Sequence, residues 1–510
     1  MMIHGQNLST NTENENENEN EPLLPENNRY PAKNTTKPYT KLVVLLYLLI
    51  LIVDFGGLLQ IAPMTQIFET VICRKFYARY PANQGIEEIN HSCKVQEVQS
   101  ELALLKGVQS FLSILPNLLL TIPYGVLVNI YGRQLSLCLA MLGLCLQLTW
   151  IILISWFSDV FSLRLIWLSS AFHIIGGGPS VALSIVYILV ADKVPHSYRA
   201  QVFFGLDAAR LLAVAVGTAT SSVLMKRGPW IPMFFALLIT YVGSSFALFI
   251  PTGGPGSSLM SNSRHNSLED TNASDVVSTT IFSSALETKY VLFKDDLYRF
   301  KKSLSINSLA RKILAMSLVS TLTSSSSSII LIYASKRFDW SFAKANLLTT
   351  LRASVNLIVI LLLIPLVGFW LIVRCKVSHR ERETYLARGS ALVILLGLSI
   401  VAIAPTPTLL ITGVVVSSLG FGADALLRSI LTSVIPSHEI GTFYTSMTLL
   451  QNLGESAGGL LYSTLFSVAL NLQGFWLGLP FIISAILSVL SLVMVSDARL
   501  SHDKSEDQED

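Results

Sequence analysis

Long apolar stretches separated by shorter polar segments fill most of this 510-residue chain. Each has the length that a helix needs to cross roughly 30 Å of hydrocarbon, and none shows the roughly 10-residue alternating segments of a membrane barrel. The sequence therefore predicts an all-α membrane protein with twelve spanning helices, at residues 42–62, 101–123, 135–156, 164–190, 200–224, 230–250, 310–333, 343–373, 389–405, 408–434, 442–468 and 475–496.

The polar segments predict the domain organisation. We expect a disordered cytosolic tail over residues 1–41, a six-helix lobe over 42–250, a cytosolic linker over 251–309, a second six-helix lobe over 310–496 and a short cytosolic tail over 497–510. The first tail is too poor in apolar groups to fold alone, and the linker is rich in Ser, Gly and Asn.

The distribution of Lys and Arg predicts the orientation. With both tails in the cytosol, the inside segments carry roughly twice as many of these residues as the outside group, in which we count Lys106 near a helix start. No short apolar region lies near Met1, so a cleaved signal peptide is not expected. We expect the cell membrane, with the vacuolar membrane as the alternative because Glu19 and Leu23-Leu24 fit an acidic-dileucine sorting pattern.

The two halves of the chain share short motifs in the same order. Their spacing, about 240 residues each time, is typical of a duplicated six-helix unit. Such a repeat predicts a two-lobed transporter with its site between the lobes. The matching pairs are Ile122-Pro123 with Ile364-Pro365, Val194-Pro195 with Ile435-Pro436, and Trp230 with Trp476.

Composition narrows the function classes. Hydrophobic residues make up 51% and charged residues 14% of the chain, and the mean hydropathy is +0.56, which excludes an ordinary soluble domain. The net charge of +3 gives no reason to expect nucleic-acid binding. The sequence contains no Walker motif or histidine-rich cluster, so we expect neither an ATP-driven pump nor an enzyme, and no metal or cofactor. The expected partners are the lipid bilayer and a small-molecule substrate, with the chain acting as a monomer.

One glycine-rich motif follows the second predicted span. It runs Gly125-Val-Leu-Val-Asn129-Ile-Tyr-Gly132-Arg133, in which the glycines permit a tight turn and Arg133 can reach helix-end carbonyls or an acidic group. The motif resembles the loop signature of the major facilitator superfamily, Gly-x-x-x-Asp-x-x-Gly-Arg, with Asn129 where that family has Asp. The resemblance implies two six-helix lobes that move about a central cavity, with the motif as a cytosolic gate.

A narrower resemblance covers nearly the whole chain. Cys93 with residues 101–107, the glycines 176–178, and residues 427–433 and 474–481 are similar to fungal facilitators distantly related to the proton-coupled folate transporter. This resemblance implies proton-coupled efflux of a secondary metabolite or drug. Uptake by proton symport stays open, as does a non-transporting membrane sensor. We expect the cavity to draw Leu, Ser, Phe and Tyr side chains from spans one, four, seven and ten.

Ionisable side chains inside the predicted spans are candidates for transport or coupling. Each raises the free energy of membrane insertion by roughly 2.5–3.5 kcal/mol at a helix centre, so we expect it to face the cavity or another charge. Asp207 and Arg210 are three residues apart, and Asp424 and Arg428 are four apart, so each couple shares a helix face and can form an ion pair. These couples are either structural ion pairs or parts of the transport route.

Three further ionisable residues, Asp54, Arg352 and Glu455, have no opposite charge within one helical turn. Burial of Asp54 or Glu455 would favour proton uptake, which makes both candidates for proton coupling. Arg352 could hold an anionic substrate or a carboxylate of the protein. A polar lobe interface without transport chemistry is the alternative for all three.

The first outer loop carries the candidates for covalent modification. Cys73 and Cys93 share this loop on the oxidising side, so we expect a disulfide between them. Asn90 begins the sequon Asn-His-Ser on the same side and is the expected glycosylation site.

Overall fold

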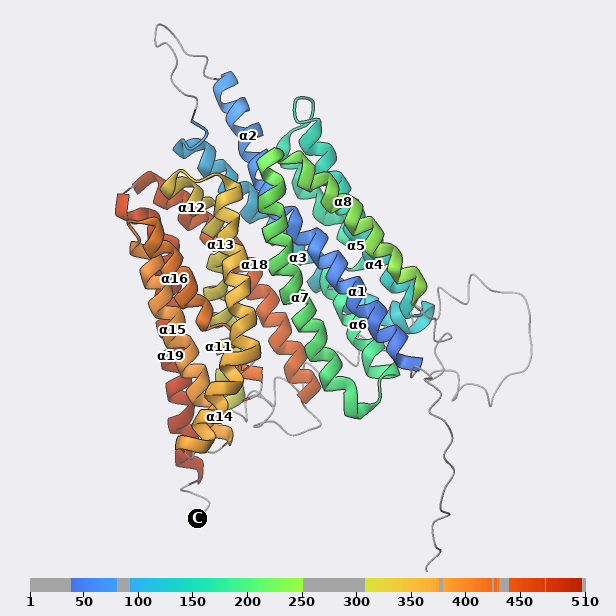
Figure 1. Ribbon diagram of the computed structural model, residues 1–510, viewed down its shortest axis with the longest axis vertical. Helices are drawn as coiled ribbons and strands as arrows, with labels where there is room; N and C mark the ends of the chain where they lie inside the picture. The colour runs from blue at the N-terminus through green and yellow to red at the C-terminus, as the bar shows by residue number, and fades with distance from the viewer. Residues whose placement is uncertain are drawn as a thin grey trace, which may run out of the picture.

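The computed structural model describes residues 38–79, 92–250, 308–375, 379–423, 426–428, 430, 440–472 and 474–506. The described residues form helices and no strands, and the helices pack into one elongated bundle (Figure 1). A helix satisfies all its backbone hydrogen bonds internally, which is what a segment within hydrocarbon requires. The predicted all-α class is confirmed.

The first group of helices, here called the N-lobe, extends to residue 249. Its long helices pack mainly through α1 against α7 and α8, and α4 against α6 and α8. The elements are α1 (Pro38–Leu59), α2 (Ile61–Arg79), α3 (Gln96–Tyr131), α4 (Arg133–Trp156), η1 (Leu163–Phe172), α5 (His173–Gly176), α6 (Gly178–Lys193), α7 (His196–Leu224), η2 (Met225–Arg227), α8 (Trp230–Ser245) and η3 (Phe246–Phe249).

The second group, here called the C-lobe, begins at residue 308. Within it, α15 packs against α16 and α19, and α11 packs against α18 and α19. The elements are α11 (Ser308–Ser325), η4 (Ser326–Ile329), α12 (Ile330–Phe338), α13 (Phe342–Ile358), the π-helical turn η5 (Val359–Leu363), α14 (Ile364–Cys375), α15 (His379–Ile403), α16 (Pro407–Leu419), α18 (Ile440–Leu472), η6 (Gly474–Gly478) and α19 (Leu479–Glu506).

Nine helical segments of the described residues are long and apolar enough to cross a membrane, and α16 is a shorter apolar helix. The long helices α3 and α18 lie in the middle of the bundle (Figure 1). The first predicted span, 42–62, is one part of a longer helical segment, Thr40–Arg79, because α2 continues almost directly from α1. The number of twelve membrane spans stays a prediction.

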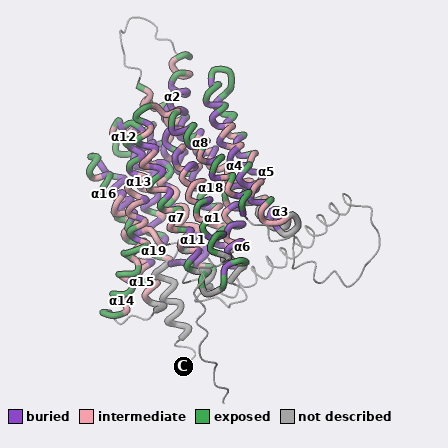
Figure 2. Tube along the Cα trace, turned by 45° about the vertical axis from the view of Figure 1, so that its right-hand side comes forward, coloured by how far each residue is buried: buried purple, intermediate pink, exposed green. Residues whose placement is uncertain are grey.

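Large apolar side chains lie exposed on the surface of the bundle. Leu238 is 60% exposed, Phe369 67% and Trp370 56%. Figure 2 shows exposed and buried positions interleaved along the same helices. Lipid tails solvate such side chains as well as a protein core does, so this surface fits a chain that is selected to lie in a bilayer.

One glycine pair interrupts the segment that the sequence predicts as a single span at 164–190. Gly177 and Gly178 have φ of +73° and +75°, which favour glycine, and the helix is interrupted there between α5 and α6. The close approach is a second reason for glycine, since a Cβ at Gly178 would lie 2.0 Å from the Asn117 side-chain oxygen. The break lets residues near the glycines line a cavity.

Candidate functional site

A cavity of about 360 Å³ lies between the two lobes. Its described lining comes from α2, α3, α5 and α6 of the N-lobe and from α18 of the C-lobe, and most of it can hydrogen-bond or carries charge. The lining residues are Met64, Lys106, Gln109, Ser110, Ser113, Ile114, Asn117, His173, Pro179, Ser180, Asn452 and Glu455.

This lining agrees only in part with the sequence-based expectation of Leu, Ser, Phe and Tyr from spans one, four, seven and ten. Ser180 comes from predicted span four, whereas most of the lining comes from α3 and α18. Hydropathy cannot tell which face of an apolar helix points inward, so it could not single out α3 and α18. A second pocket of about 110 Å³ shares Met64 and Gln109 with the first and adds further polar groups at Gln60 and Gln147. All of its lining belongs to the N-lobe, so the polar region extends from the main cavity into the N-lobe.

Lys106 is a charged residue of the cavity that sequence reasoning misplaced. It lies in the fourth turn of α3, which begins at Gln96, whereas the predicted span began at 101. Its Nζ donates to Thr65 Oγ1 at 2.7 Å, and it forms no ion pair with any described residue. The available signal was a lysine inside a predicted span, but the sequence cannot show that the face of α3 that carries Lys106 turns toward the cavity.

His173 lines the same cavity and is held on both sides of its ring. Nδ1 lies 3.2 Å from the Ser113 carbonyl oxygen, and Nε2 lies 2.8 Å from Gln147 Oε1. The residue is only 2% exposed. The two contacts fix the ring against α3 and α4, which is the geometry of a packed, hydrogen-bonded histidine.

Glu455 reaches the same cavity from α18 of the C-lobe. The residue is exposed, and it forms no ion pair or hydrogen bond with the part of the chain that the structure describes. Arg210 lies near enough for its charge to act on Glu455. However, Arg210 Nε donates to Asp54 Oδ2 at 3.2 Å, so this guanidinium already has a carboxylate partner.

The ion pair of Arg210 therefore joins α7 to α1. The within-helix pair that the sequence suggested for Asp207 and Arg210 does not form, because α1 packs against α7 and places Asp54 beside Arg210. Asp207 instead accepts a hydrogen bond from Tyr187 at 3.2 Å. Sequence spacing could show only local partners, and these contacts cross between helices.

Neither Arg428 nor Arg352 is among the described residues that line the cavity. Arg428 donates from Nη2 to Gln451 Oε1 at 2.8 Å, and Asp424, its expected partner, lies outside the described residues. Arg352 lies on α13, half-buried, and has no hydrogen bond or ion pair within the described ranges.

The glycine-rich motif surrounds the junction of α3 and α4. Gly132 has φ of +92°, which makes it the residue that turns the chain, and Arg133 forms an ion pair with Asp192 at the end of α6. Gly125 and Asn129 belong to the last turns of α3, and the side chain of Asn129 lies outside the described set. The motif thus ties α4 to α6 within the N-lobe.

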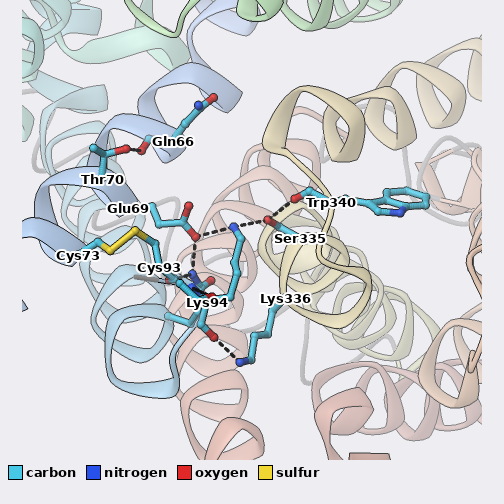
Figure 3. A network of polar contacts seen from close by, with 11 residues as sticks. Gln66, Glu69, Thr70, Cys73, Cys93, Lys94, Ser335, Lys336 and Trp340 are labelled. Carbon is cyan, nitrogen blue, oxygen red and sulfur yellow. Dashed lines mark hydrogen bonds and ion pairs between the residues drawn. A yellow bond between two sulfur atoms is a disulfide. The ribbon is translucent and has the colours of Figure 1, made fainter. Parts of the chain in front are cut away.

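The opposite end of the bundle carries a disulfide between Cys73 and Cys93, and we call it the disulfide end. Next to the bond, Lys94 Nζ donates to Glu69 Oε1 at 2.6 Å and to Ser335 Oγ, also at 2.6 Å (Figure 3). Lys336 of α12 donates to the Lys94 carbonyl oxygen. Because Glu69 and Lys94 belong to the N-lobe and Ser335 and Lys336 to the C-lobe, this network joins the lobes. Asn90 lies outside the described residues.

Other contacts join the lobes at the same end. Ser100 hydrogen-bonds Ser467 between α3 and α18, and Thr218 hydrogen-bonds Thr350 at 2.9 Å between α7 and α13. Gly107 packs so closely that a Cβ there would lie 2.4 Å from the Ser463 hydroxyl oxygen. The hydrogen bonds that join the lobes through Lys94, Ser100 and Thr218 all lie in this half of the bundle.

The apolar cores follow the same division. One cluster contains buried residues of both lobes, among them Phe68 and Leu102 with Tyr333 and Phe466. The two other clusters each belong to a single lobe, one around Leu46 and the other in the C-lobe. The lobes share a core at the disulfide end and have separate cores toward the other end.

Comparisons with known proteins agree with this architecture. Residues 99–459 match the family model described as Major Facilitator Superfamily. The chain is 31% identical to the efflux pump ustT of Aspergillus flavus, over 90% of this chain and 88% of that protein, and 28% identical to the MFS efflux pump atnC of Emericella nidulans, over 89% and 87%. The fold is similar to that of a D-xylose–proton symporter, with a TM-score of 0.61 at 13% identity, over 90% of this chain and 97% of that one.

Proposed function

This chain belongs to the Major Facilitator Superfamily, and on that premise we propose that it exports a small organic compound, a secondary metabolite or drug, in exchange for protons. The observation that carries the proposal is the charged cavity between the lobes, into which the N-lobe contributes Lys106 and the C-lobe contributes Glu455. The direction follows the relatives that are efflux pumps.

Alternating access follows from how the lobes touch. Contacts across the lobe interface at the disulfide end close one side of the cavity, and separate cores toward the other end leave each lobe able to move as a unit. Export then requires the Lys94 contacts with Ser335 and Lys336 to break and re-form in each cycle.

The orientation belongs to the same proposal. We place the disulfide end outside the cell, because that side is oxidising, and both tails in the cytosol, in line with the bias in Lys and Arg. The conformation described here is then inward-facing. In this orientation Asn90 lies on the side where glycosylation occurs, and the cell membrane is the expected site of action of a monomeric protein.

Proton coupling is assigned to Glu455. Its carboxylate faces the cavity between the lobes, and Arg210 can act on it electrostatically. Movement of the lobes changes the distance between these two groups, because they belong to different lobes, so proton affinity at Glu455 changes with conformation. Asp54 holds Arg210 in place within the N-lobe.

The test compares the small molecules inside and outside cells with and without this chain by untargeted mass spectrometry. The comparison is repeated after an uncoupler collapses the proton gradient. Export predicts a compound that moves to the medium only while the gradient exists. A gradient-dependent shift of a compound into the cells would replace export with proton-symport uptake, and the absence of any shift would overturn transport.

A further inference from the structure

We propose that the cavity recognises a zwitterionic compound of short-peptide length, with its carboxylate at Lys106 and its protonated amine at Glu455. This inference rests on the proposed function, since it names the substrate class of the same cavity. Its support comes from the charges, the polar lining and the spacing of these two residues.

Neither Lys106 nor Glu455 forms an ion pair with a described residue. Lys106 donates only to the neutral Thr65 hydroxyl, and Glu455 forms no ion pair among the described residues. The nearby Arg210 is committed to Asp54. A charge placed at membrane depth is costly unless it is paired or lies in a water-filled cavity. A ligand that carries both charges supplies the two missing partners at once.

The rest of the lining disfavours a purely apolar ligand. Ligand pockets are mostly apolar with a few polar groups, but this cavity presents amide and hydroxyl groups at Gln109, Ser110, Asn117 and Asn452. An apolar ligand would displace water from these groups without replacing its hydrogen bonds, and each lost bond costs free energy. Peptide-like amides can both donate and accept hydrogen bonds along this wall.

The antiparallel packing of α3 and α18 gives the distance between the two charged positions. Ser100 pairs with Ser467, and Gly459 lies against Ser110, so Glu455 is level with a position one turn beyond Ser110 on α3. The two charged residues are then separated by about eight residues of helix, or about 12 Å at 1.5 Å per residue.

That separation selects for length. A ligand whose two charges lie about that far apart fits this backbone spacing best, and the ammonium and carboxylate of a single amino acid lie much closer together than that. Extended chain covers about 3.4 Å per residue, so three or four residues match the spacing. The cavity volume of about 360 Å³ lies within the range of small-molecule sites.

The same assignment explains an exchange. While Glu455 holds a proton it is neutral and offers nothing to an ammonium group. When the proton leaves, the carboxylate can bind the amine. Proton and ligand therefore compete for one side chain, which is what opposite movement of the two requires.

The experiment uses the purified full-length protein in lipid nanodiscs and four probes: alanine, dialanine, trialanine and tetra-alanine. Ligand binding to the folded state raises the melting temperature, so the midpoint of that rise is titrated for each probe. We expect trialanine or tetra-alanine to bind at least about tenfold more tightly than alanine. N-acetyl and C-terminal amide forms of the better probe, which each remove one charge, should weaken binding by about tenfold or more.

Two variants assign each charge to its residue. The Lys106→Gln variant should bind the C-terminal amide as well as it binds the free peptide, because it has lost the partner of the carboxylate. The Glu455→Gln variant should bind the N-acetyl form as well as it binds the free peptide, because it has lost the partner of the amine. The matched controls are Lys226→Gln and Glu101→Gln, which remove exposed charges away from the cavity and should keep the wild-type differences. A variant is interpreted only if it elutes as a single species, and Lys106→Arg and Glu455→Asp serve as charge-conserving replacements for one that does not.

Four results would overturn the proposal: binding of none of the probes, equal binding of blocked and free peptides, no dependence on length, or variants that keep the wild-type differences. These outcomes are separate from those of the export test, because binding is measured without a proton gradient. Export of a compound that lacks either charge would overturn this inference and leave the proposed function intact. Binding of the peptides without gradient-driven export would overturn the proposed function and leave this inference intact.

Discussion

Replacing Ser335 with alanine is expected to shift the protein toward conformations in which the lobes part at the disulfide end. Ser335 Oγ accepts a hydrogen bond from Lys94 Nζ across the lobe interface at 2.6 Å, and it donates to the Trp340 carbonyl oxygen within the C-lobe at 2.7 Å. Only the first of these bonds is lost when the lobes separate. The second is made in both conformations, so its loss cancels from the equilibrium between them.

The size of the effect follows from the bond that is removed. A hydrogen bond to a charged group contributes about 1.5–3 kcal/mol net, and Lys94 keeps its pair with Glu69 in the variant. At about 1.4 kcal/mol for each factor of ten, the ratio of parted to closed conformations should rise by roughly 10- to 150-fold.

Double electron–electron resonance measures this ratio directly. Spin labels at Val160 of the N-lobe and Phe475 of the C-lobe, both exposed at the disulfide end, report the distance between the lobes. Cys138, Cys145 and Cys375 are replaced by alanine so that the labels attach only at the chosen positions, and the disulfide is kept. Ser335→Ala should increase the long-distance component relative to the parent.

The control is Ser341→Ala. Ser341 is also a hydrogen-bonded serine at the disulfide end, but its side chain accepts from Lys344 N within the C-lobe and caps α13. This variant should lose about 1 kcal/mol of stability without a change in the distance distribution. An unchanged distribution in Ser335→Ala, or the same change in both variants, would refute the assignment of Ser335 as a contact that holds the lobes together.

Three further predictions concern the framework, and thermal unfolding of the purified protein checks each of them. Cys73→Ser removes a disulfide between residues 20 apart and should cost about 3 kcal/mol, so a reductant should destabilise the wild type but not the variant. Asp54→Asn should lower the free energy of unfolding by about 1 kcal/mol, because the ion pair that it removes is partly exposed. Adding Arg210→Gln to this variant should lower the free energy of unfolding by less than Arg210→Gln does in the wild type. If the two effects simply add, the pairing of Asp54 with Arg210 is contradicted. Gly176→Ala places a Cβ 2.2 Å from the backbone of α4 and should lower the free energy of unfolding by about 1–3 kcal/mol. Gly57→Ala has open space around it and should not lower the free energy of unfolding. Equal effects of the two substitutions would contradict the close packing of Gly176 against α4.

The helices could be predicted because the membrane imposes a simple rule. A span needs a long apolar run, and only a helix satisfies its backbone there, so hydropathy alone identified the fold class. It could not identify α2, whose Glu69, Arg74 and Lys75 make the continuation from α1 polar. Nothing in an apolar run shows which face of its helix turns toward the other lobe, and the packing of α3 is what places Lys106 within the cavity.

The site could be predicted only where the signal was local. Glu455 and Asp54 were identifiable because a charge in an apolar span is unusual. Their surroundings were not, since Asp54 meets Arg210 across 156 positions of sequence and Lys94 meets Ser335 across 241. One sequence without related sequences beside it carries no signal for such pairs. The resemblance in the glycine-rich motif indicated the family, but it gave no information about the network at the disulfide end.

The central claim is that a proton gradient drives export through the cavity by way of Glu455. The most direct measurement is the concentration ratio of the exported compound across the membrane of proteoliposomes, as a function of an imposed pH difference, for the wild type and Glu455→Gln. The account predicts that the wild-type ratio rises with the gradient, while the variant brings the compound only to equal concentrations on both sides. A variant that still concentrates the compound as the wild type does would contradict the claim.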